Sequence, residues 1–252
     1  MPVFTRFIMT KLFDATNHLL IYSSDIVPEQ HKHMAAHIII SLENQIKVET
    51  DRDELLCYGV MIPSGIPHKI YTYNSPVLVF LYDNTTAVSA TITETKSIDK
   101  QICITVKEYF FEIEQNISKE KYQDFEYRCL QLLEINKRQN FSYDDRITAA
   151  VDYIKNNCMD KITRKTVADA VFMSEDRFSH LFTGQIGMTF SAYVIYQRII
   201  ATYTAIINGY TVTDAALYAG FSSSSHFADV SKRVFGLSAK NITKDISFIK
   251  IA

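Results

Sequence analysis

The sequence predicts an α+β protein in which a small β-barrel or double-sheet jelly roll is followed by a helical hairpin and an all-helical C-terminal region. Three observations predict this fold class. Short β-rich runs separated by turn residues fill the first third of the chain. From about Thr105 the hydrophobic period changes from two residues to 3.6, and the last hundred or so residues contain one helical unit twice.

Length and composition set the first limits. The chain has 252 residues, 47% of them hydrophobic, which suits two modest domains better than one. No window approaches the roughly 18 apolar residues of a membrane span, and the N-terminal segment lacks the features of a signal peptide, so we expect a cytoplasmic protein without a membrane partner. Cys57, Cys103, Cys129 and Cys158 form no C-x-x-C pair, which favours buried free thiols over a zinc or redox motif.

The strands are predicted from six runs rich in β-branched and aromatic residues. Each run is bounded by Gly, Pro, Asn, Asp or other turn-forming residues. Regular short spacing of this kind favours a small barrel or a double-sheet jelly roll. The runs lie at 18–22, 37–42, 45–50, 55–62, 68–73 and 76–83.

Two helices are predicted after the strands. Val106, Phe110 and Ile113 fall on one helical face, and a second apolar face includes Tyr122 and Phe125. A hairpin of two such helices is a candidate dimer interface. Packing of the same apolar faces against the chain's own barrel is an equal alternative.

The helical region begins after a polar, aperiodic segment at 136–145, which has the composition of a linker. Its repeated unit has the spacing of a helix-turn-helix, in which small residues let two helices approach and apolar residues fix their angle. Two copies joined by one long helix are far less common by chance than one. The first copy contains Val167, Ala168, Val171, Met173, Phe178 and Leu181, and the second contains Ala215, Ala216, Ala219, Gly220, Phe221, Phe227 and Val230.

These residues resemble a known pattern that spans about 90 positions without a gap. It comprises "S-x-x-R-F-S-H-L-F" at Ser174–Phe182, Gly187, "FSAYVIYQRI" at Phe190–Ile199, "AALYAGF" at Ala215–Phe221, and then Phe227 and Gly236. On this pattern the last hundred residues resemble the DNA-binding domain of the AraC/XylS family of bacterial transcription regulators.

The resemblance implies that the second helix of each motif enters the major groove of double-stranded promoter DNA, in successive segments. Side chains on the exposed side of each helix then face the base edges, and neighbouring cations face phosphates. By alignment the base-reading residues are Asp176, Ser179, His180, Ser225, His226 and Asp229, and the phosphate-binding residues are Arg177, Lys232 and Arg233.

Charge and three departures from the family pattern weaken the second unit. The net charge is −2, and residues 144–252 hold only 12 Lys and Arg against 10 Asp and Glu. Asp229 stands where the family often has Arg, Ser231 where it has a core Phe, and Ala239 where it usually has Pro. Aspartate can accept from cytosine N4, yet phosphates repel it. We therefore expect the second unit to bind weakly, or to orient the protein more than it reads sequence.

Histidines in the first third resemble the two histidine motifs of the cupin barrel. His31 and His33 share a strand face if the strand is regular, His68 follows P-x-G-x-x-H, and His37 stands where a cupin enzyme usually has Glu. His31, His33 and His68 are thus weak candidate metal ligands, but we expect no metal or other cofactor. The expected role of the barrel is a small-molecule pocket lined by Tyr22, His31, His33, His37, Tyr58, His68, Phe80 and Tyr82.

The resulting expectation is a regulator and not an enzyme, with no catalytic residues, since no nucleophile and base pair or phosphate-binding glycine loop stands out. Its parts are a cupin-like effector-binding barrel at 1–100, a helical hairpin at 101–138 for possible homodimerisation, and a double helix-turn-helix domain at 139–252. Two alternatives remain open: a metal-dependent cupin enzyme, and a regulator whose decayed DNA-binding domain acts through protein contacts.

Overall fold

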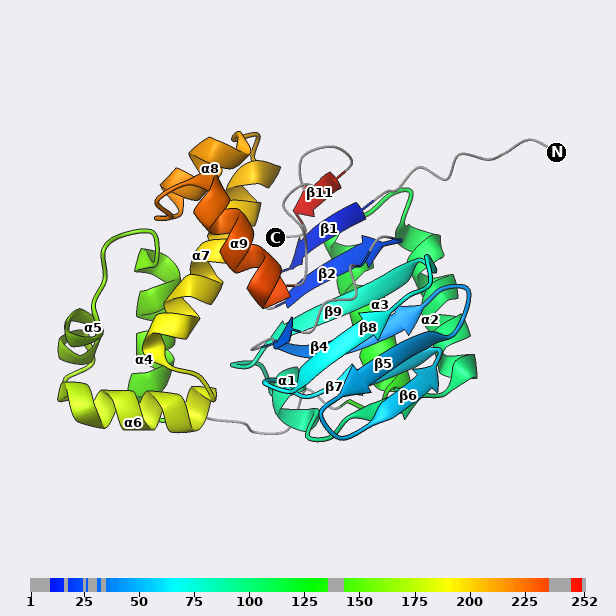
Figure 1. Ribbon diagram of the computed structural model, residues 1–252, viewed down its shortest axis with the longest axis horizontal. Coiled ribbons are helices and arrows are strands. Elements are labelled where there is room, and N and C mark those ends of the chain that lie inside the picture. The colour runs from blue at the N-terminus through cyan, green and yellow to red at the C-terminus, as the bar shows by residue number, and fades with distance from the viewer. Residues whose placement is uncertain are drawn as a thin grey trace. The chain divides into compact units, whose positions relative to one another are not determined.

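The computed structural model describes residues 10–15, 18–24, 26, 31–32, 35–135, 143–235 and 246–250. They belong to two compact units. The first comprises Met1–Lys137 with Phe235–Ala252, and the second comprises Arg138–Val234. All described strands lie in the first unit, and the second is helical (Figure 1).

Two β-sheets build the first unit, as the double-sheet prediction requires. Neighbouring strands are antiparallel except for the pair β1–β11, which is parallel. The seven-stranded sheet contains, in order, β10 (Lys96–Ile98), β7 (Gly59–Ile62), β4 (Ala35–Ser41), β9 (Val77–Asp83), β2 (His18–Ser23), β1 (Thr10–Ala15) and β11 (Ile246–Lys250), and the four-stranded sheet contains β3 (His31–Lys32), β8 (Pro67–Tyr71), β5 (Ile46–Thr50) and β6 (Glu54–Cys57).

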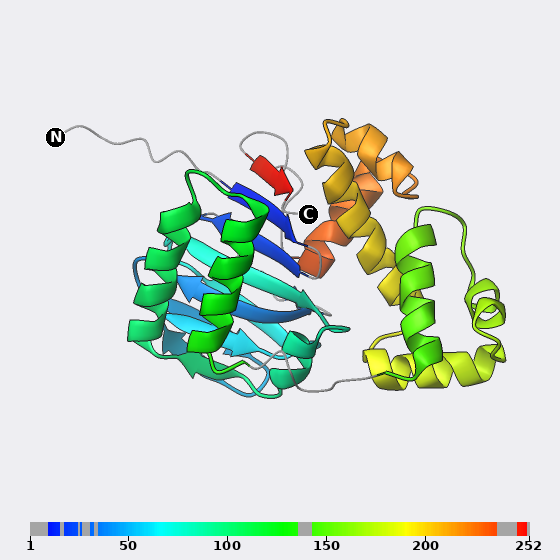
Figure 2. The same ribbon diagram turned by 180° about the vertical axis from the view of Figure 1, so that it is seen from behind.

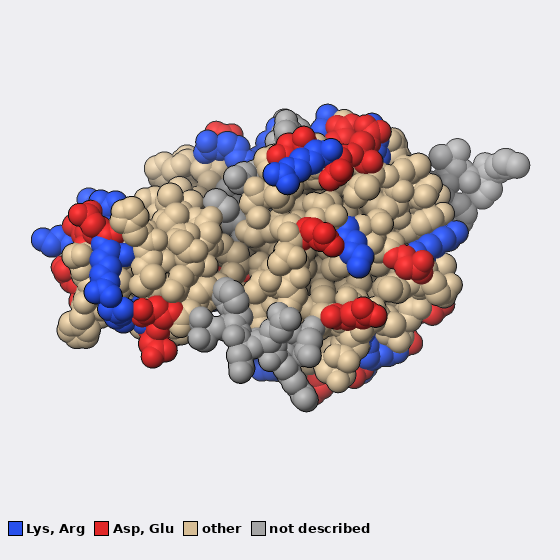
Figure 3. All heavy atoms as spheres, turned by 90° about the horizontal axis from the view of Figure 1, so that it is seen from below, with Lys and Arg blue, Asp and Glu red and all other residues tan. Residues whose placement is uncertain are grey.

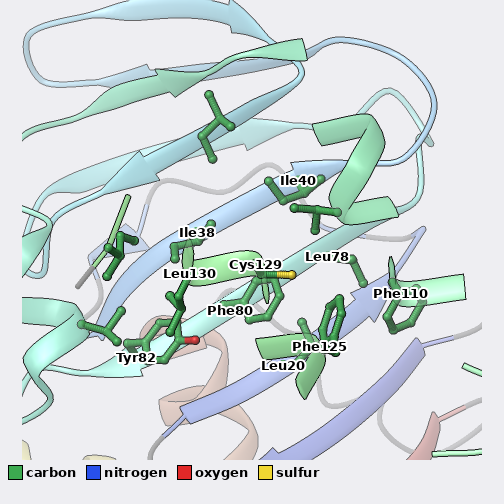
Figure 4. Packing of buried hydrophobic residues seen from close by; sticks show 14 of the residues in the cluster. Leu20, Ile38, Ile40, Leu78, Phe80, Tyr82, Phe110, Phe125, Cys129 and Leu130 are labelled. Atoms are coloured by element: carbon green, nitrogen blue, oxygen red, sulfur yellow. The ribbon is translucent and has the colours of Figure 1, made fainter. Parts of the chain in front are cut away.

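A helical hairpin covers one face of the seven-stranded sheet (Figure 2). It consists of α2 (Lys100–Ile113) and α3 (Lys119–Leu132), begun by the caps Asp99 and Ser118, each of which accepts a hydrogen bond from a backbone N–H of the first turn. Figure 4 shows Phe110 and Phe125 of the hairpin packed with strand residues such as Phe80. The hairpin's apolar face is therefore buried against its own sheet. Packing within the chain explains why that face is apolar, without a dimer contact through it.

The opposite face of this sheet is covered by the four-stranded sheet. Ile39 of β4 and Val48 of β5 are fully buried, as expected for strands that alternate between two covered faces. Because both faces of the central strands β4 and β9 are covered, every residue of these two strands is buried.

The run at 55–62, expected to be one strand, forms two strands in different sheets. β6 ends at Cys57 and β7 begins at Gly59. A Cβ on Gly59 would lie 2.7 Å from Cys103 Sγ and 2.9 Å from the Ile39 carbonyl oxygen, so only glycine allows α2 to approach at this crossing.

The C-terminal end of the chain also differs from the expectation. The sequence predicts that all of 139–252 belongs to the helical domain, whereas β11 pairs with β1 at the edge of the seven-stranded sheet and belongs to the first unit. The short strands β1, β3 and β10 were likewise not predicted. A short helix, α1 (Ala87–Thr91), precedes β10.

The second unit is helical within the described residues, as the sequence predicts for this region. Thr163, Thr189 and Thr211 cap their helices by accepting from a backbone N–H three residues on. None of the helices within the described ranges has the length and apolar character needed to cross a membrane. The helices are α4 (Asp145–Asn157), α5 (Arg164–Ala170), α6 (Glu175–Ile186), α7 (Phe190–Ile207), α8 (Val212–Tyr218) and α9 (Ser224–Phe235).

Candidate nucleic-acid interface

Helices α5 and α6 form one helix-turn-helix motif, and α8 and α9 form the other, with α7 between them (Figure 1). The two turns close with the same backbone hydrogen bond. The Met173 N–H donates to the Ala168 carbonyl at 2.9 Å, and the Phe221 N–H donates to the Ala216 carbonyl at 2.9 Å. Both alanines are fully buried, which lets the two helices of each motif approach closely. The sequence repeat is therefore a structural repeat.

The left-handed residue of each turn differs between the motifs. Gly220 has φ +86° in the second turn, as its identity predicts, whereas Phe172 has φ +55° in the first. A bulky residue with positive φ is uncommon. The Phe172 side chain is 95% exposed, so its ring adds nothing to the core of the motif.

Helix α6 buries one face and presents the other to solvent. Phe178 and Phe182 are fully buried, and the Phe182 ring contacts the ring of Tyr193 on α7 edge-on at 5.7 Å. Asp176 and His180 are exposed and Ser179 is half-buried on the outer side. These three side chains lie on the solvent-facing side of α6.

Helix α9 is arranged in the same way. Phe227 and Val230 are buried, while Ser225, His226 and Asp229 are exposed. The His226 ring is held against the turn, because its Nδ1 lies 3.0 Å from the Ser222 hydroxyl and its ring contacts that of Phe221. His226 is therefore less free to turn toward a base edge than His180.

Ser231, which replaces the family's core Phe, has a specific partner. It is fully buried on α9, and its hydroxyl lies 2.6 Å from that of Tyr203 on α7. In the first motif the corresponding contact is between the rings of Phe182 and Tyr193. In the second motif the hydrogen-bonded pair of Tyr203 and Ser231 replaces it. This departure is thus explained by packing and does not indicate decay.

Cations expected to bind phosphate are exposed. Arg177 of α6 and Lys232 and Arg233 of α9 all reach solvent. On the face of the helical unit in Figure 3, blue and red side chains lie beside one another along one edge, and most of the remaining surface is uncharged. The weak positive balance expected from the sequence is therefore not concentrated into one basic patch on this face.

A cleft of about 660 Å³ lies beside Ser179, and its cations were not predicted as functional residues. Arg164 and Lys165, in the first turn of α5, line it with Thr163. The Arg164 Nε donates to Glu175 Oε2 at 3.1 Å. Two adjacent cations directly after the helix cap Thr163 were the available signal in the sequence.

Within the described part of the chain, residues expected to line an effector pocket lie on opposite faces of the seven-stranded sheet. His37 of β4 and His68 of β8 face each other between the two sheets, with ring centroids 4.7 Å apart. Phe80 and Tyr82 of β9 instead pack under the hairpin (Figure 4). Strand alternation separates the two groups, since cross-strand neighbours share a face and adjacent residues do not.

Tyr22 and Tyr58 also pack against the core under the hairpin. The Tyr82 hydroxyl donates to Glu126 Oε1 at 3.0 Å, and burial raises its pKa well above the usual value. His18 lies in the same buried polar cluster, with Nε2 2.7 Å from the Tyr122 hydroxyl. The aromatic residues proposed for the pocket therefore join the sheet to the hairpin of α2 and α3.

The candidate metal ligands are only partly described. His31 is opposite His68 in the β3–β8 register, whereas His33 lies outside the described residues. The His68 Nδ1 lies 2.8 Å from the Ile66 carbonyl oxygen. No group of three His, Cys, Asp or Glu side chains that could hold a metal occurs within the described ranges.

Comparison with known proteins gives one family match and a set of similar folds. Residues 167–245 match the family model of a helix-turn-helix domain. A comparison with curated proteins found no match. Helices α6 to α9 lie within the matched range, and α5 begins before it and ends inside it.

Structures of ToxT from Vibrio cholerae share the fold over nearly the whole chain. An apo variant of ToxT has a TM-score of 0.63 at 11% identity, covering 91% of this chain and 97% of that one. A second ToxT structure has a TM-score of 0.58 at 12% identity, covering 93% and 94%. ToxT with unsaturated fatty acid bound has a TM-score of 0.56 at 13% identity, covering 89% and 94%. Residues 167–245 thus match a helix-turn-helix domain, and the chain as a whole shares the fold of these ToxT structures.

Proposed function

We propose that the chain binds promoter DNA through α6 and α9 together, and that a small molecule bound in the first unit controls this binding. The observation that carries the proposal is the repeated motif: two turns closed by the same hydrogen bond, each followed by a helix with an exposed polar face. A major groove admits one helix, so two motifs joined by α7 suit two successive groove segments.

The two helices contribute unequally in this proposal. On α6, His180 and Ser179 offer hydrogen bonds to base edges, and Asp176 can accept from cytosine N4. On α9, Asp229 repels phosphates and His226 is held against its own turn. Sequence discrimination is therefore assigned mainly to α6, and α9 mainly orients the protein.

Phosphate binding is assigned to cations on both motifs. Arg177, Lys232 and Arg233 are exposed as the resemblance requires. Arg164 and Lys165 extend this set, because they line the cleft beside Ser179. Because Arg164 already forms an ion pair with Glu175, Lys165 is the stronger candidate of the two for binding phosphate.

Effector control is assigned to the first unit, with the hairpin 101–138 as the proposed dimerisation element of a cytoplasmic homodimer. His37 and His68 place two polar rings in the buried space between the sheets. ToxT structures contain an unsaturated fatty acid in one case and a naphthalenyl butenoic acid in another. A carboxylic acid is therefore the first ligand class to test here. A ligand with different affinities for two arrangements of the protein would shift DNA binding without any chemistry.

DNA binding is tested by gel shift on the DNA upstream of the chain's own coding sequence, with a salt series and an unrelated fragment of equal length. We expect a specific complex that weakens as salt rises, because phosphate contacts release counterions. Equal binding to both fragments at every salt concentration would overturn sequence-specific recognition.

Effector binding is tested by thermal unfolding of the full chain with a series of carboxylic acids of increasing apolar length. A binding acid raises the unfolding temperature in a concentration-dependent way. We expect His68→Gln to reduce that rise and Lys155→Gln, a change in the other unit, to leave it unaltered. No rise with any acid would refute this ligand class and leave the DNA-binding result unaffected.

A further inference from the structure

One side chain in the middle of α7 joins the two motifs. The Arg198 guanidinium donates three hydrogen bonds to backbone carbonyls from two separate segments. Nε donates to the Cys158 carbonyl at 2.7 Å, and one Nη donates to the Asp160 carbonyl at 3.0 Å. The other Nη donates to the Gly220 carbonyl at 3.2 Å. The first two carbonyls precede the first motif, and the third lies in the turn of the second.

The accepting carbonyls lie where helices end. Cys158 is the C-cap of α4, and Gly220 directly follows Ala219, the C-cap of α8. The last carbonyls of a helix have no partner within it and form the negative end of its dipole. The Arg198 cation therefore satisfies the orphan C-cap acceptor of α4 and lies at the carboxyl end of α8 as well. A guanidinium is suited to this, because its donors form a fixed planar fork, whereas an ammonium is a point charge.

Gly220 makes the approach possible. A Cβ at this position would lie 3.0 Å from the Met159 carbonyl oxygen and 3.1 Å from Arg198 Cζ. The turn of the second motif is thus packed directly on the segment that leads into the first. Phe172, at the equivalent position of the first turn, is exposed, so this close contact occurs at one turn and not at the other.

We propose that Arg198 is a positioning residue that sets the separation and relative angle of the two helix-turn-helix motifs. This role rests on the proposed function in one respect. If the two motifs bind DNA, a fixed separation between them determines which spacing of groove segments the protein accepts. Helix α7 sets how far apart the motifs lie along its axis. Arg198 restricts the rotation of the second motif about that axis by tying it to the Cys158–Asp160 segment, which fixes the angle and the through-space distance between the motifs.

The first test measures the separation without DNA. Spin labels are attached at Thr183→Cys on α6 and Leu217→Cys on α8, both exposed positions, and their distance distribution is recorded in the full chain. We expect Arg198→Met to shift or broaden the distribution. Arg198→Lys should lie between Arg198→Met and the parent, because the charge remains and the fork is lost. Lys155→Met, which removes a cation from α4 without touching the three carbonyls, is the matched control and should leave it unchanged.

The second test measures spacing preference. A selected DNA site is compared with a version in which about five base pairs, half a helical turn, are inserted between its two segments. The parent protein should lose affinity on insertion by roughly tenfold or more, because linked modules lose avidity of roughly 10²–10⁴ when geometry prevents both from binding. Arg198→Met should bind the unaltered site more weakly and lose less on insertion.

An unchanged distance distribution in Arg198→Met, with helical content preserved, would overturn the proposal. So would an insertion penalty equal to the parent's. If the parent protein binds no DNA, the proposed function fails, while the distance measurement still decides the role of Arg198. If Arg198→Met does not fold, Arg198→Lys provides both readouts.

Discussion

The hydroxyl groups of Tyr203 on α7 and Ser231 on α9 lie 2.6 Å apart in the core of the second motif. Burial raises the pKa of Tyr203, and Ser231 is fully buried, so this is a hydrogen bond between neutral groups out of contact with water. From the sequence alone, Ser231 is expected to weaken the second unit. In the structure it is half of a polar pair that joins the linking helix to the second recognition helix.

The first prediction concerns this pair. Tyr203→Phe and Ser231→Ala should each lower the free energy of unfolding by about 1–3 kcal/mol, because each leaves a buried hydroxyl without this bond. The double variant should lose less than the sum of the two. Urea unfolding of the four proteins measures the coupling, with Tyr210→Phe on an exposed tyrosine as the control. Additive losses would show that the two hydroxyls do not interact.

The second prediction separates the two recognition helices. His180→Ala should relax discrimination at one base position by about 1–3 kcal/mol. Asp229→Asn should strengthen binding to all sequences alike, because it removes repulsion from phosphates. Competition binding at one fixed salt concentration measures both variants. A loss of specificity in Asp229→Asn instead would mean that Asp229 accepts a hydrogen bond from a base.

The third prediction concerns the cysteines, all four of which are buried and free. Burial raises the pKa of each thiol, that of Cys103 to about 12. The thiolate is the reactive form, so the native protein should react slowly with a thiol reagent at about pH 8 and show four reactive groups only when unfolded. One fast thiol in the native protein would contradict this burial.

The same thiols predict a loss of stability in alkali. Their folded pKa values lie above the unfolded value of about 8.5, so the folded chain keeps protons that the unfolded chain releases. Their contribution is complete below about pH 8.5 and is lost as pH rises further. Urea midpoints across this range should fall, and Cys103→Ala should reduce the dependence on pH.

The fourth prediction concerns acid. Asp144 caps α4, and its hydrogen bonds with the Arg146 side chain and backbone N–H lower its pKa to about 2. Its contribution to stability is therefore present above the unfolded pKa of about 3.9 and is lost as pH falls toward 2. Unfolding of Asp144→Asn should depend less on pH in this window than that of the parent, whereas Asp145→Asn should behave like the parent. Identical pH profiles for Asp144→Asn and the parent would contradict the assignment.

The helical unit was predictable because its signals are local. Thr163 and Thr189 cap helices, Ala168 and Ala216 recur at one spacing, and Gly220 occupies a left-handed turn, so residue type alone indicates the backbone. The contribution of Arg198 could not be predicted in this way. Its three acceptors are backbone carbonyls, and because every residue type has one, the sequence does not indicate which of them Arg198 binds.

The first unit was less predictable because central strands of its seven-stranded sheet are covered on both faces. Leu12 and Phe13 of β1 are adjacent and both fully buried, so that strand lacks the alternation that marks a half-exposed one. The position of the expected pocket residues depends on a related feature. His37 and Phe80 were grouped by composition, but the side of the sheet on which each lies depends on register, which the sequence does not state.

The central claim is that two motifs bind two successive groove segments. Selection of bound sequences from a random double-stranded pool by the full chain tests it most directly. The account predicts an enriched site with two segments about 10–10.5 base pairs apart, the one that contacts α6 being the more sharply defined. Enrichment of a single segment, or of no sequence at all, would contradict it.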